Sequence, residues 1–258
     1  MVEYDQKIAR EIERSYITPE VAQQRIRTLE GLALRSGEHV LDAGCGTGLL
    51  TQELAMAVGP EGCVVGIDNS LDMLELATKR CKGLPQVHLK QRSVEDLPEK
   101  EESFDAVTCV QVLLYLSEVS KALAELNRVL KRGGRIAVIE TDWRSVVLNG
   151  SDDVLSRRML AAWDDAVPSP NLPVRLGPLL LAQGFTAIRV DAIPILNSSH
   201  TLGNFSVGAL EWIARYAQEQ GAVSAEEAAA WLADQSRLGE EGAFFFCVNR
   251  FLFTGVKC

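Results

Sequence analysis

A glycine-rich segment that follows an acidic residue is the feature of the sequence with the clearest chemical meaning. Residues 40–48 read Val-Leu-Asp-Ala-Gly-Cys-Gly-Thr-Gly, between an apolar run and a helical pattern. Gly44, Gly46 and Gly48 allow the backbone to turn tightly and to approach a ligand closely. The carboxylate of Asp42 would oppose a pyrophosphate bound at the start of the next helix. The segment therefore favours a ligand that carries cationic groups, such as a sulfonium and an ammonium group.

A second acidic residue follows the next apolar run along the chain. Asp68 ends the run Cys63–Ile67. In doubly wound folds an acidic residue at this point accepts hydrogen bonds from ribose hydroxyls. The spacing Gly-x-Gly-x-Gly also differs from the Gly-x-Gly-x-x-Gly of dinucleotide sites. Together with Asp42, these features predict a site for a cationic cofactor that contains a ribose.

The elements that must position these residues alternate short apolar runs with helical patterns. This alternation predicts βα units and a parallel sheet. Helices are expected from Thr18-Pro19 to about Arg35, after the glycine loop, after Ser70, and over 116–130. The expected strands are 40–42, 63–68, 87–90, 104–110 and 136–139.

The last third of the chain has a different pattern. Residues 142–173 are expected to be irregular or helical. Ser224-Ala-Glu-Glu227 predicts a capping box at the start of a helix. Further helices are expected over 176–183, 205–220 and 225–237, and further strands over 185–190 and 244–256. The sequence thus predicts one α/β domain with helical insertions near its end.

Residues 19–140 resemble, in order, the class I S-adenosylmethionine-dependent methyltransferases. Residues 40–48 resemble motif I of that family, and Val64-Val-Gly-Ile-Asp68 resembles motif II. The further matching segments are 93–98, which resembles the segment that lines the adenine, 104–111, which resembles the fourth strand, and 130–139, which resembles the lead into the fifth strand. Within the family the sequence is most similar to the small-molecule group that includes the quinone-biosynthesis (UbiE-type) enzymes.

The resemblance implies a role in cofactor binding for a set of residues. The three loop glycines and Asp42 would hold the methionyl part, and Asp68 the ribose. Family members often carry Asp where this chain has Ser93, so that contact to the adenine differs. The other implied cofactor residues are Asn69, Met73, Ser93, Val94 and Glu95 around the adenine, Gln111 near the methionyl backbone, and Tyr16 and Arg25 as a cover from the N-terminal helix.

The resemblance also implies an architecture. The fold would be a Rossmann-like, doubly wound, seven-stranded and mostly parallel sheet with an antiparallel last strand. The chain would form a single methyltransferase domain over residues 1–258. Within it we expect an N-terminal helical cover (1–35), a cofactor-binding core (36–142) and two helical insertions that form a substrate lid (143–175 and 197–240).

Few residues stand out as candidates for catalysis or for binding the methyl acceptor. His200 lies in a polar loop and is the histidine best placed for acid–base work. Asp142 and Trp143 follow the fifth expected strand, at the edge where ligands bind in open α/β sheets. Trp143 could hold a flat acceptor, but core packing explains it equally well; for Trp212, which could also contact the acceptor, packing in a helix core is the better explanation. The cysteines form no Cys-x-x-Cys pair and the acids form no evident magnesium site, so no metal is predicted.

The composition excludes some classes of partner. The chain has 258 residues and a formal net charge of −9, which disfavours a nucleic-acid partner. No apolar run is long enough to span a bilayer. The cysteines are scattered among apolar residues, as is typical of a reducing compartment. A cytoplasmic protein, either a monomer or a homodimer, is therefore expected.

The sequence therefore predicts transfer of a methyl group from S-adenosylmethionine to an O, N or C atom of a small-molecule metabolite, by in-line displacement. The methyl acceptor is not determined. A non-catalytic, S-adenosylmethionine-binding regulatory module is the alternative of a different class. An NAD-dependent oxidoreductase is a weaker alternative, because Asp42 and the glycine spacing disfavour it. Nucleic-acid methylation is weaker still, because the net charge opposes it.

Overall fold

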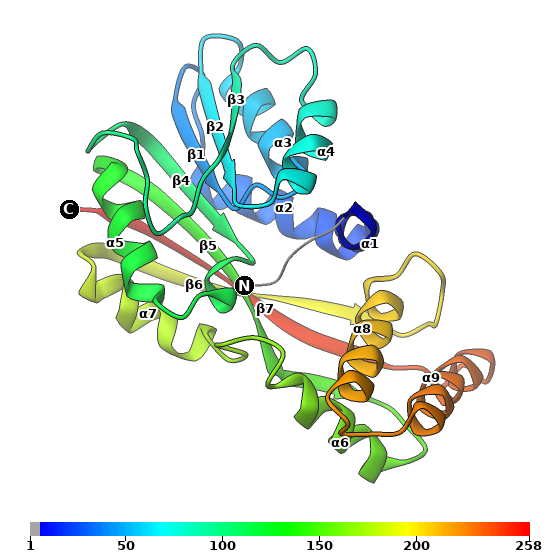
Figure 1. Cartoon of the computed structure of the whole chain (residues 1–258). Coiled ribbons are helices and arrows are strands. Elements are labelled where there is room, and N and C mark those ends of the chain that lie inside the picture. The colour runs from blue at the N-terminus through cyan, green and yellow to red at the C-terminus, as the bar shows by residue number, and fades with distance from the viewer. Residues whose placement is uncertain (1–5) are drawn as a thin grey trace.

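A seven-stranded sheet lies at the centre of the molecule, which the computed structural model describes over residues 6–258. The strand order is β3-β2-β1-β4-β5-β7-β6, and β7 runs antiparallel to both of its neighbours (Figure 1). The strands are β1 (His39–Ala43), β2 (Cys63–Asp68), β3 (Val87–Gln91), β4 (Phe104–Val110), β5 (Leu130–Leu148), β6 (Phe185–Asn197) and β7 (Phe246–Lys257). The expected Rossmann-like sheet with an antiparallel last strand is confirmed.

Helices pack on both faces of this sheet because successive strand residues point to opposite sides. Val40 of β1 belongs to the apolar core under α2 and α3, whereas the next residue, Leu41, belongs to the core under α5 and α7. The helices are α1 (Gln6–Tyr16), α2 (Pro19–Leu32), α3 (Leu49–Val58), α4 (Leu71–Arg80), α5 (Val119–Val129), α6 (Asp153–Trp163), α7 (Pro173–Ala182), α8 (Phe205–Glu219) and α9 (Ala225–Glu240). The sheet is thus buried between two helical layers (Figure 1).

Two strands are longer than the sequence predicts. The expectation of irregular or helical structure from residue 142 is wrong for 142–148, because β5 continues to Leu148 after a shift of register. Its end pairs with Cys247 and Phe246 of β7. β6 likewise extends to Asn197 along the other edge of β7. Both extensions depend on pairing with β7, which lies far away in the sequence, so local patterns could not show them.

Several helix boundaries also differ from the predictions. The helix expected over 116–130 begins at Val119, after a single 3₁₀ turn at Leu113–Tyr115. The Thr18 hydroxyl does not cap α2. Instead it donates a hydrogen bond of 2.9 Å to the carbonyl oxygen of Ser15, which stabilises the bend between α1 and α2. The capping box at Ser224 and Glu227 is confirmed.

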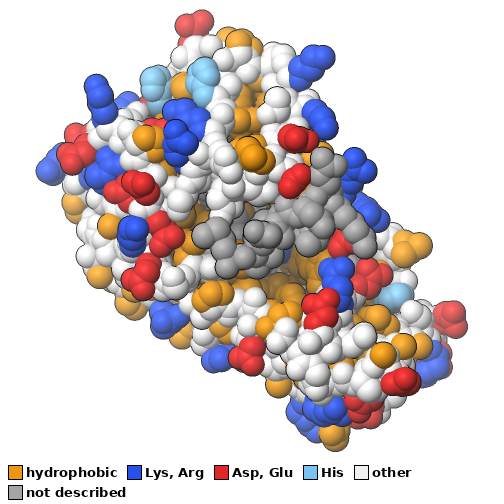
Figure 2. Space-filling model, viewed as in Figure 1, with side chains coloured by type: hydrophobic (Ala, Val, Ile, Leu, Met, Phe, Trp, Pro, Cys, Tyr) orange, Lys and Arg blue, Asp and Glu red, His pale blue; other side chains and the backbone are white. Residues whose placement is uncertain are grey.

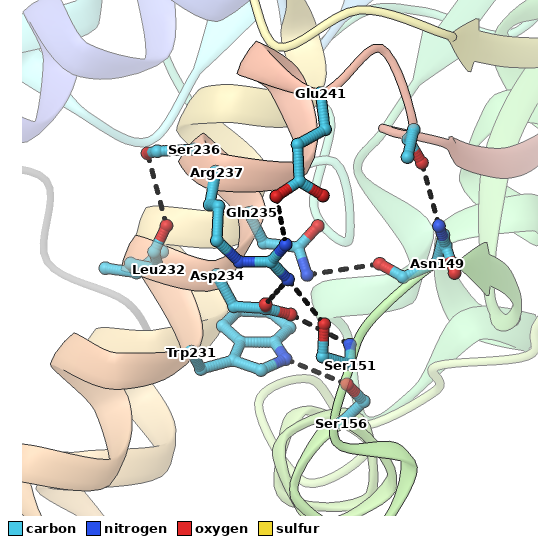
Figure 3. A network of polar contacts seen from close by, with 11 residues as sticks. Asn149, Ser151, Ser156, Trp231, Leu232, Asp234, Gln235, Ser236, Arg237 and Glu241 are labelled. Atoms are coloured by element: carbon cyan, nitrogen blue, oxygen red, sulfur yellow. Dashed lines mark hydrogen bonds and ion pairs between the residues drawn. The ribbon is translucent and has the colours of Figure 1, made fainter.

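Helices α6, α8 and α9 pack together beyond the ends of β5, β6 and β7, and we refer to them as the helical module (Figure 1). Figure 3 shows how α9 is held against the segment that joins β5 to α6. The indole Nε1 of Trp231 donates to Ser156 Oγ at 3.0 Å, and the Asp234 carboxylate accepts the Ser151 amide at 2.9 Å. Within residues 6–258, no helix is long and apolar enough to cross a membrane.

Candidate active site

A pocket of about 170 Å³ opens at the carboxyl ends of β1, β2 and β4, where α1 and α8 complete its wall. Ligands of open α/β sheets bind at this edge. Figure 2 shows apolar side chains gathered inside a hollow near the centre of the face in view. The residues predicted from the sequence that line the pocket are Tyr16, Gly44, Gly46, Asp68, Asn69, Met73, Ser93, Val94, Gln111 and Trp212.

The glycine loop forms one wall of this pocket, with a backbone conformation that favours glycine. Gly44 and Gly46 have φ of 78° and 52°, in the left-handed region. A Cβ on Gly44 would lie 2.1 Å from a methyl carbon of Val112. A Cβ on Gly46 would have no heavy atom within 4 Å. Gly44 is therefore required for packing, whereas Gly46 leaves open space in the pocket wall.

Gly48 has a structural role rather than a place in the pocket. It precedes α3 with φ of 78°, and its ideal Cβ would lie 2.9 Å from the Cα of Ala77 on α4. It therefore allows α3 and α4 to pack closely. The expectation that Gly48 contacts the cofactor finds no support in this placement.

Asp68 lies at the carboxyl end of β2 and lines the pocket. Its carboxylate accepts the backbone N–H groups of Gly46 and Ser70, each at 2.9 Å. Burial raises the pKa of Asp68, and these backbone hydrogen bonds oppose the rise. The carboxylate thus fixes the glycine loop relative to the end of β2 and still faces the pocket.

Asp42 lies beneath the pocket and not on its wall, although the sequence predicted a direct contact. Only 2% of the residue is exposed. Its two oxygens accept hydrogen bonds from the hydroxyls of Thr51 and Thr108, at 2.6 and 2.9 Å. Burial raises the pKa of Asp42 to about 6. The charge of Asp42 therefore acts on the pocket electrostatically, although its side chain does not line the pocket wall.

The two cover residues of the N-terminal helices have different positions. Tyr16 lines the pocket. Arg25 does not, because its guanidinium binds the Glu53 carboxylate at 2.8 Å and donates to the carbonyl oxygen of Tyr16 at 2.7 Å. Arg25 therefore positions the end of α1, and the predicted contact with the methionyl carboxylate finds no support.

Of the residues that the sequence predicted around an adenine, Glu95 does not line the pocket. Ser93 and Val94 line the wall, whereas Glu95 does not, and its amide donates to Ser93 Oγ at 3.2 Å. Arg92, which the sequence analysis missed, lines the wall instead. Arg92 lies directly after β3, at the same edge of the sheet as Asp68. This position in the sequence could have indicated that Arg92 lines the pocket.

A buried acid supports the wall that follows β4. Gln111 has φ of 57°, and its side-chain oxygen accepts the Thr141 hydroxyl at 2.6 Å. The carboxylate of Glu140 is fully buried and accepts the amides of Val112 and Leu113, at 3.1 and 2.7 Å. Burial raises the pKa of Glu140 to about 8. Glu140 thus orders the segment that carries the pocket wall.

The candidates for catalysis are not brought to the pocket. The amide of Arg144 donates to Asp142, and neither lines the pocket. Trp143 is buried edge-on against Trp163, with ring centroids 5.3 Å apart. His200 packs against the Phe244 ring at 5.3 Å. These positions give the three predicted residues no contact with a ligand in the pocket.

A group of mainly apolar residues that the sequence did not single out completes the wall. They are Ile12, Thr47, Val110, Val112, Tyr115 and Leu116. In a sequence, an apolar side chain that lines a pocket cannot be distinguished from one that packs in the core. Tyr115 had the best signal, since it follows the end of β4 in a short 3₁₀ turn.

The comparison with protein families decides the broad identity of the chain. Residues 34–167, just over half of the chain, match the family described as "Methyltransferase domain". The chain belongs to this methyltransferase family. Its matching region begins before β1 and ends after α6, so it contains the glycine loop, Asp68 and the wall after β4.

Curated relatives agree with this assignment. An uncharacterized 37.1 kDa protein in transposon TN4556 of Streptomyces fradiae is 37% identical over 168 residues, which are 65% of this chain and 48% of that protein. The demethylmenaquinone methyltransferase of Lactobacillus johnsonii is 38% identical over 120 residues, which are 45% of this chain and 49% of that enzyme. The chain spans about half the length of these relatives. The resemblance to the quinone-biosynthesis group is confirmed.

Solved structures show the same fold. Phosphoethanolamine N-methyltransferase 2 of Haemonchus contortus, in complex with phosphomonomethylethanolamine and S-adenosylhomocysteine, has a TM-score of 0.64 and 18% identity over 98% of this chain and 58% of that chain. The [4+2]-cyclase SpnF has a TM-score of 0.61 and 23% identity over 92% of this chain and 81% of that chain. The fold is thus shared by proteins that differ in reaction.

Proposed function

We propose that this protein transfers the methyl group of S-adenosylmethionine to an O, N or C atom of a small molecule. The observation that carries the proposal is the Asp68 carboxylate in the pocket wall, 2.9 Å from the backbone nitrogen of Gly46. This contact joins an acid at the end of β2 to a loop that a ligand can approach closely. Membership of the methyltransferase family supports the same reaction.

The residues of the pocket fit this cofactor. The Asp68 carboxylate accepts the backbone N–H groups of Gly46 and Ser70, and a carboxylate with about four lone-pair sites retains capacity for a ribose hydroxyl. The open space at Gly46 leaves room beside that carboxylate. Met73 and Val94 offer apolar surface to a purine ring. The nearby charges of Asp68 and Asp42 favour a cationic sulfonium over a pyrophosphate.

The opposite end of the pocket suits the methyl acceptor. When bound, S-adenosylmethionine supplies a methyl group that its sulfonium already activates. The protein has chiefly to align the acceptor with that group, because alignment alone contributes a large part of such a rate enhancement. Tyr16, Tyr115 and Trp212 form an aromatic wall there, which suits a small apolar or aromatic acceptor.

We also propose a role for each segment of the chain. Helices α1 and α2 cover the cofactor, with Tyr16 at the end of α1 also facing the acceptor. Residues 36–142 bind the cofactor, and the segments 143–175 and 197–240 close over the acceptor as a lid. Trp212 on α8 supports the lid assignment, because it lies in the pocket wall. No catalytic role is proposed for Asp142, His200 or Trp143.

The acidic composition supports a restricted set of partners. A net charge of −9 favours a small-molecule acceptor over a nucleic acid. The scattered cysteines favour a cytoplasmic location. A monomer or a homodimer is proposed for the oligomeric state.

A direct assay tests the proposed reaction. The protein is incubated with S-adenosylmethionine and a panel of phenolic, enolic and amine metabolites, and S-adenosylhomocysteine is quantified against a sample without acceptor. We expect acceptor-dependent product, with at least a tenfold loss in Asp68→Asn and no loss in Asp96→Asn. Asp96 is a matched control because it is exposed and does not line the pocket.

The same assay separates the two alternatives. Tight binding of S-adenosylmethionine without turnover of any acceptor would favour a non-catalytic regulatory module. Binding of NAD that is tighter than binding of S-adenosylmethionine would favour an oxidoreductase and contradict the proposal.

A further inference from the structure

Arg80, the last residue of α4, links the glycine loop to α1, which lies beside α4 (Figure 1). Its Nε donates a hydrogen bond of 2.9 Å to the carbonyl oxygen of Thr47 in the loop. Its Nη2 donates to the carboxylate of Glu13 on α1, and the two side chains form an ion pair. A single guanidinium thus contacts two segments that are distant in the sequence.

The loop end of this link lies in the pocket wall, because Thr47 lines the pocket. No backbone N–H of residues 6–258 donates to the Thr47 carbonyl oxygen, so Arg80 supplies the hydrogen bond that this acceptor needs. The Thr47 hydroxyl is buried and has no partner in the described part of the chain. A polar group of a bound ligand would satisfy that hydroxyl. Arg80 therefore holds the loop at a point where a ligand is expected.

The other end of the link lies on the helix that completes the opposite wall. Ile12 and Tyr16 of α1 line the pocket, and their spacing places them on one face of the helix. Glu13 follows Ile12 directly, so the ion pair with Arg80 is made within one turn of both residues. The position of α1 relative to the glycine loop therefore depends on the contact between Glu13 and Arg80.

Apolar packing contributes little to holding α1 in place. Of the residues from Ala9 to Tyr16, only Ala9 and Ser15 are buried. A void of about 30 Å³ also lies between α1 and α4, and its lining residues are Ala9, Arg10, Asp72, Glu75, Leu76 and Lys79. A helix with so few buried apolar side chains opens readily unless polar contacts fasten it.

Two other arginines contact α1, but neither of them contacts the glycine loop. Arg25 donates to the carbonyl oxygen of Tyr16 at 2.7 Å, and its second partner is a carboxylate on α3. Arg215 of α8 pairs with Glu11 at 3.4 Å, a longer contact. Among these three arginines, Arg80 is the one that joins α1 to the loop.

We propose that Arg80 is a positioning residue that fastens α1 to the glycine loop and thereby slows the release of a ligand bound between them. The inference rests on the proposed function, since that ligand would be S-adenosylmethionine or its product S-adenosylhomocysteine. Hydrogen bonds from a guanidinium are charge-assisted and stronger than neutral ones. Without them α1 opens more often, and the ligand leaves faster.

Two measurements on the full-length protein test this link. Hydrogen exchange of the free protein reports the opening of α1, and surface plasmon resonance gives the dissociation rate of S-adenosylhomocysteine. We expect Arg80→Gln to speed exchange in residues 12–16 about tenfold and ligand dissociation about fivefold. Arg80→Lys should retain part of the wild-type behaviour, because an ammonium group can still pair with Glu13.

Further variants separate the two ends of the link. Glu13→Gln removes the ion pair but keeps the hydrogen bond from Arg80 to Thr47, so it should change both rates in the same direction by a smaller factor. Lys82→Gln, which removes an exposed cation close to Arg80 in the sequence, should change neither. Raising the salt concentration from about 0.05 to about 0.5 M should speed dissociation from the wild type more than from Arg80→Gln, because salt screens the ion pair.

A merely structural role of Arg80 would give a different result. Arg80→Gln would then lower the urea midpoint and leave ligand dissociation from the folded protein unchanged, which would overturn the inference. Should Arg80→Gln fail to fold, Glu13→Gln decides by the same two rates.

The inference is also wrong if exchange in residues 12–16 is the same in the wild type, Arg80→Gln and Glu13→Gln. Failure of the proposed function looks different, because the wild type would then bind no S-adenosylhomocysteine. In that case the exchange rates of the free protein still decide whether Arg80 fastens α1.

Discussion

The two ends of the pocket are built in different ways. The cofactor end comes from consecutive elements, β1 to β4, and its acids and glycines lie in two short motifs. The proposed acceptor end is assembled from α1, the turn after β4 and α8, which lie far apart in the sequence. The cofactor end is thus specified by local sequence, whereas the acceptor end exists only in the folded molecule.

The largest expected effect concerns the local motif. Gly44→Ala should destabilise the protein by about 2 to 5 kcal/mol, because the new Cβ meets Val112 and the positive φ is strained for alanine. Gly37→Ala is the control, since Gly37 also has a positive φ but has open space around it. That variant should lose only about 1 to 2 kcal/mol. Urea denaturation measures both.

Equal losses in the two variants would mean that backbone strain alone, and not the packing of the loop against Val112, sets the requirement for glycine. The glycine loop at Gly44 would then be no more tightly packed, in energetic terms, than the turn at Gly37.

A second prediction concerns the wall between the two ends. Because burial raises the pKa of Glu140 from 4.5 to about 8, the folded state keeps a proton that the unfolded chain has lost. Stability should therefore fall as the pH rises from 4.5 to 8, by up to about 1.4 kcal/mol per pH unit. Glu140→Gln should remove this slope. Denaturation at pH 6.5, 7.25 and 8 measures it.

Above pH 6, the slope of stability against pH comes mainly from Glu140. Asp42, whose pKa is raised to about 6, contributes a slope of the same sign, but mainly between pH 3.8 and 6. Glu75→Gln, an exposed substitution, should retain the slope of the wild type. A Glu140→Gln variant with that same slope would show that Glu140 is ionised in the folded state.

The smallest effects are expected in the helical module. Trp231→Phe should lose about 1 to 2 kcal/mol, because it leaves the buried Ser156 hydroxyl without its donor (Figure 3). Arg237→Ala removes exposed ion pairs to Asp234 and Glu241, which solvent screens, and should destabilise the protein less than Trp231→Phe does. Thermal denaturation ranks the two variants. A larger loss of stability for Arg237→Ala than for Trp231→Phe would indicate that α9 is held mainly by the exposed ion pairs of Arg237.

The same contrast explains what the sequence could predict. The presence of the first five strands along the chain, the glycine turn and the position of Asp68 all follow from patterns within about thirty residues, and the fold contains each of them. Asp42 was expected to touch the cofactor, but Thr51 and Thr108 occupy both of its oxygens. A local sequence motif does not reveal hydrogen-bond partners that lie on neighbouring elements.

The acceptor end could not be predicted for the same physical reason. Tyr115 and Ile12 look like ordinary core residues until the fold places them around a pocket. His200, chosen for its chemical type and its place in a polar loop, lies against Phe244 instead.

Isothermal titration calorimetry with S-adenosylmethionine tests the central claim most directly. We predict one site per chain for the wild type, at least tenfold weaker binding in Asp68→Ala and Asp68→Asn, and unchanged binding in Asp96→Ala. Asp68→Asn keeps an acceptor oxygen for the loop, so it separates loss of charge from loss of the loop structure. Absence of binding by the wild type, or undiminished binding in both Asp68 variants, would contradict the account.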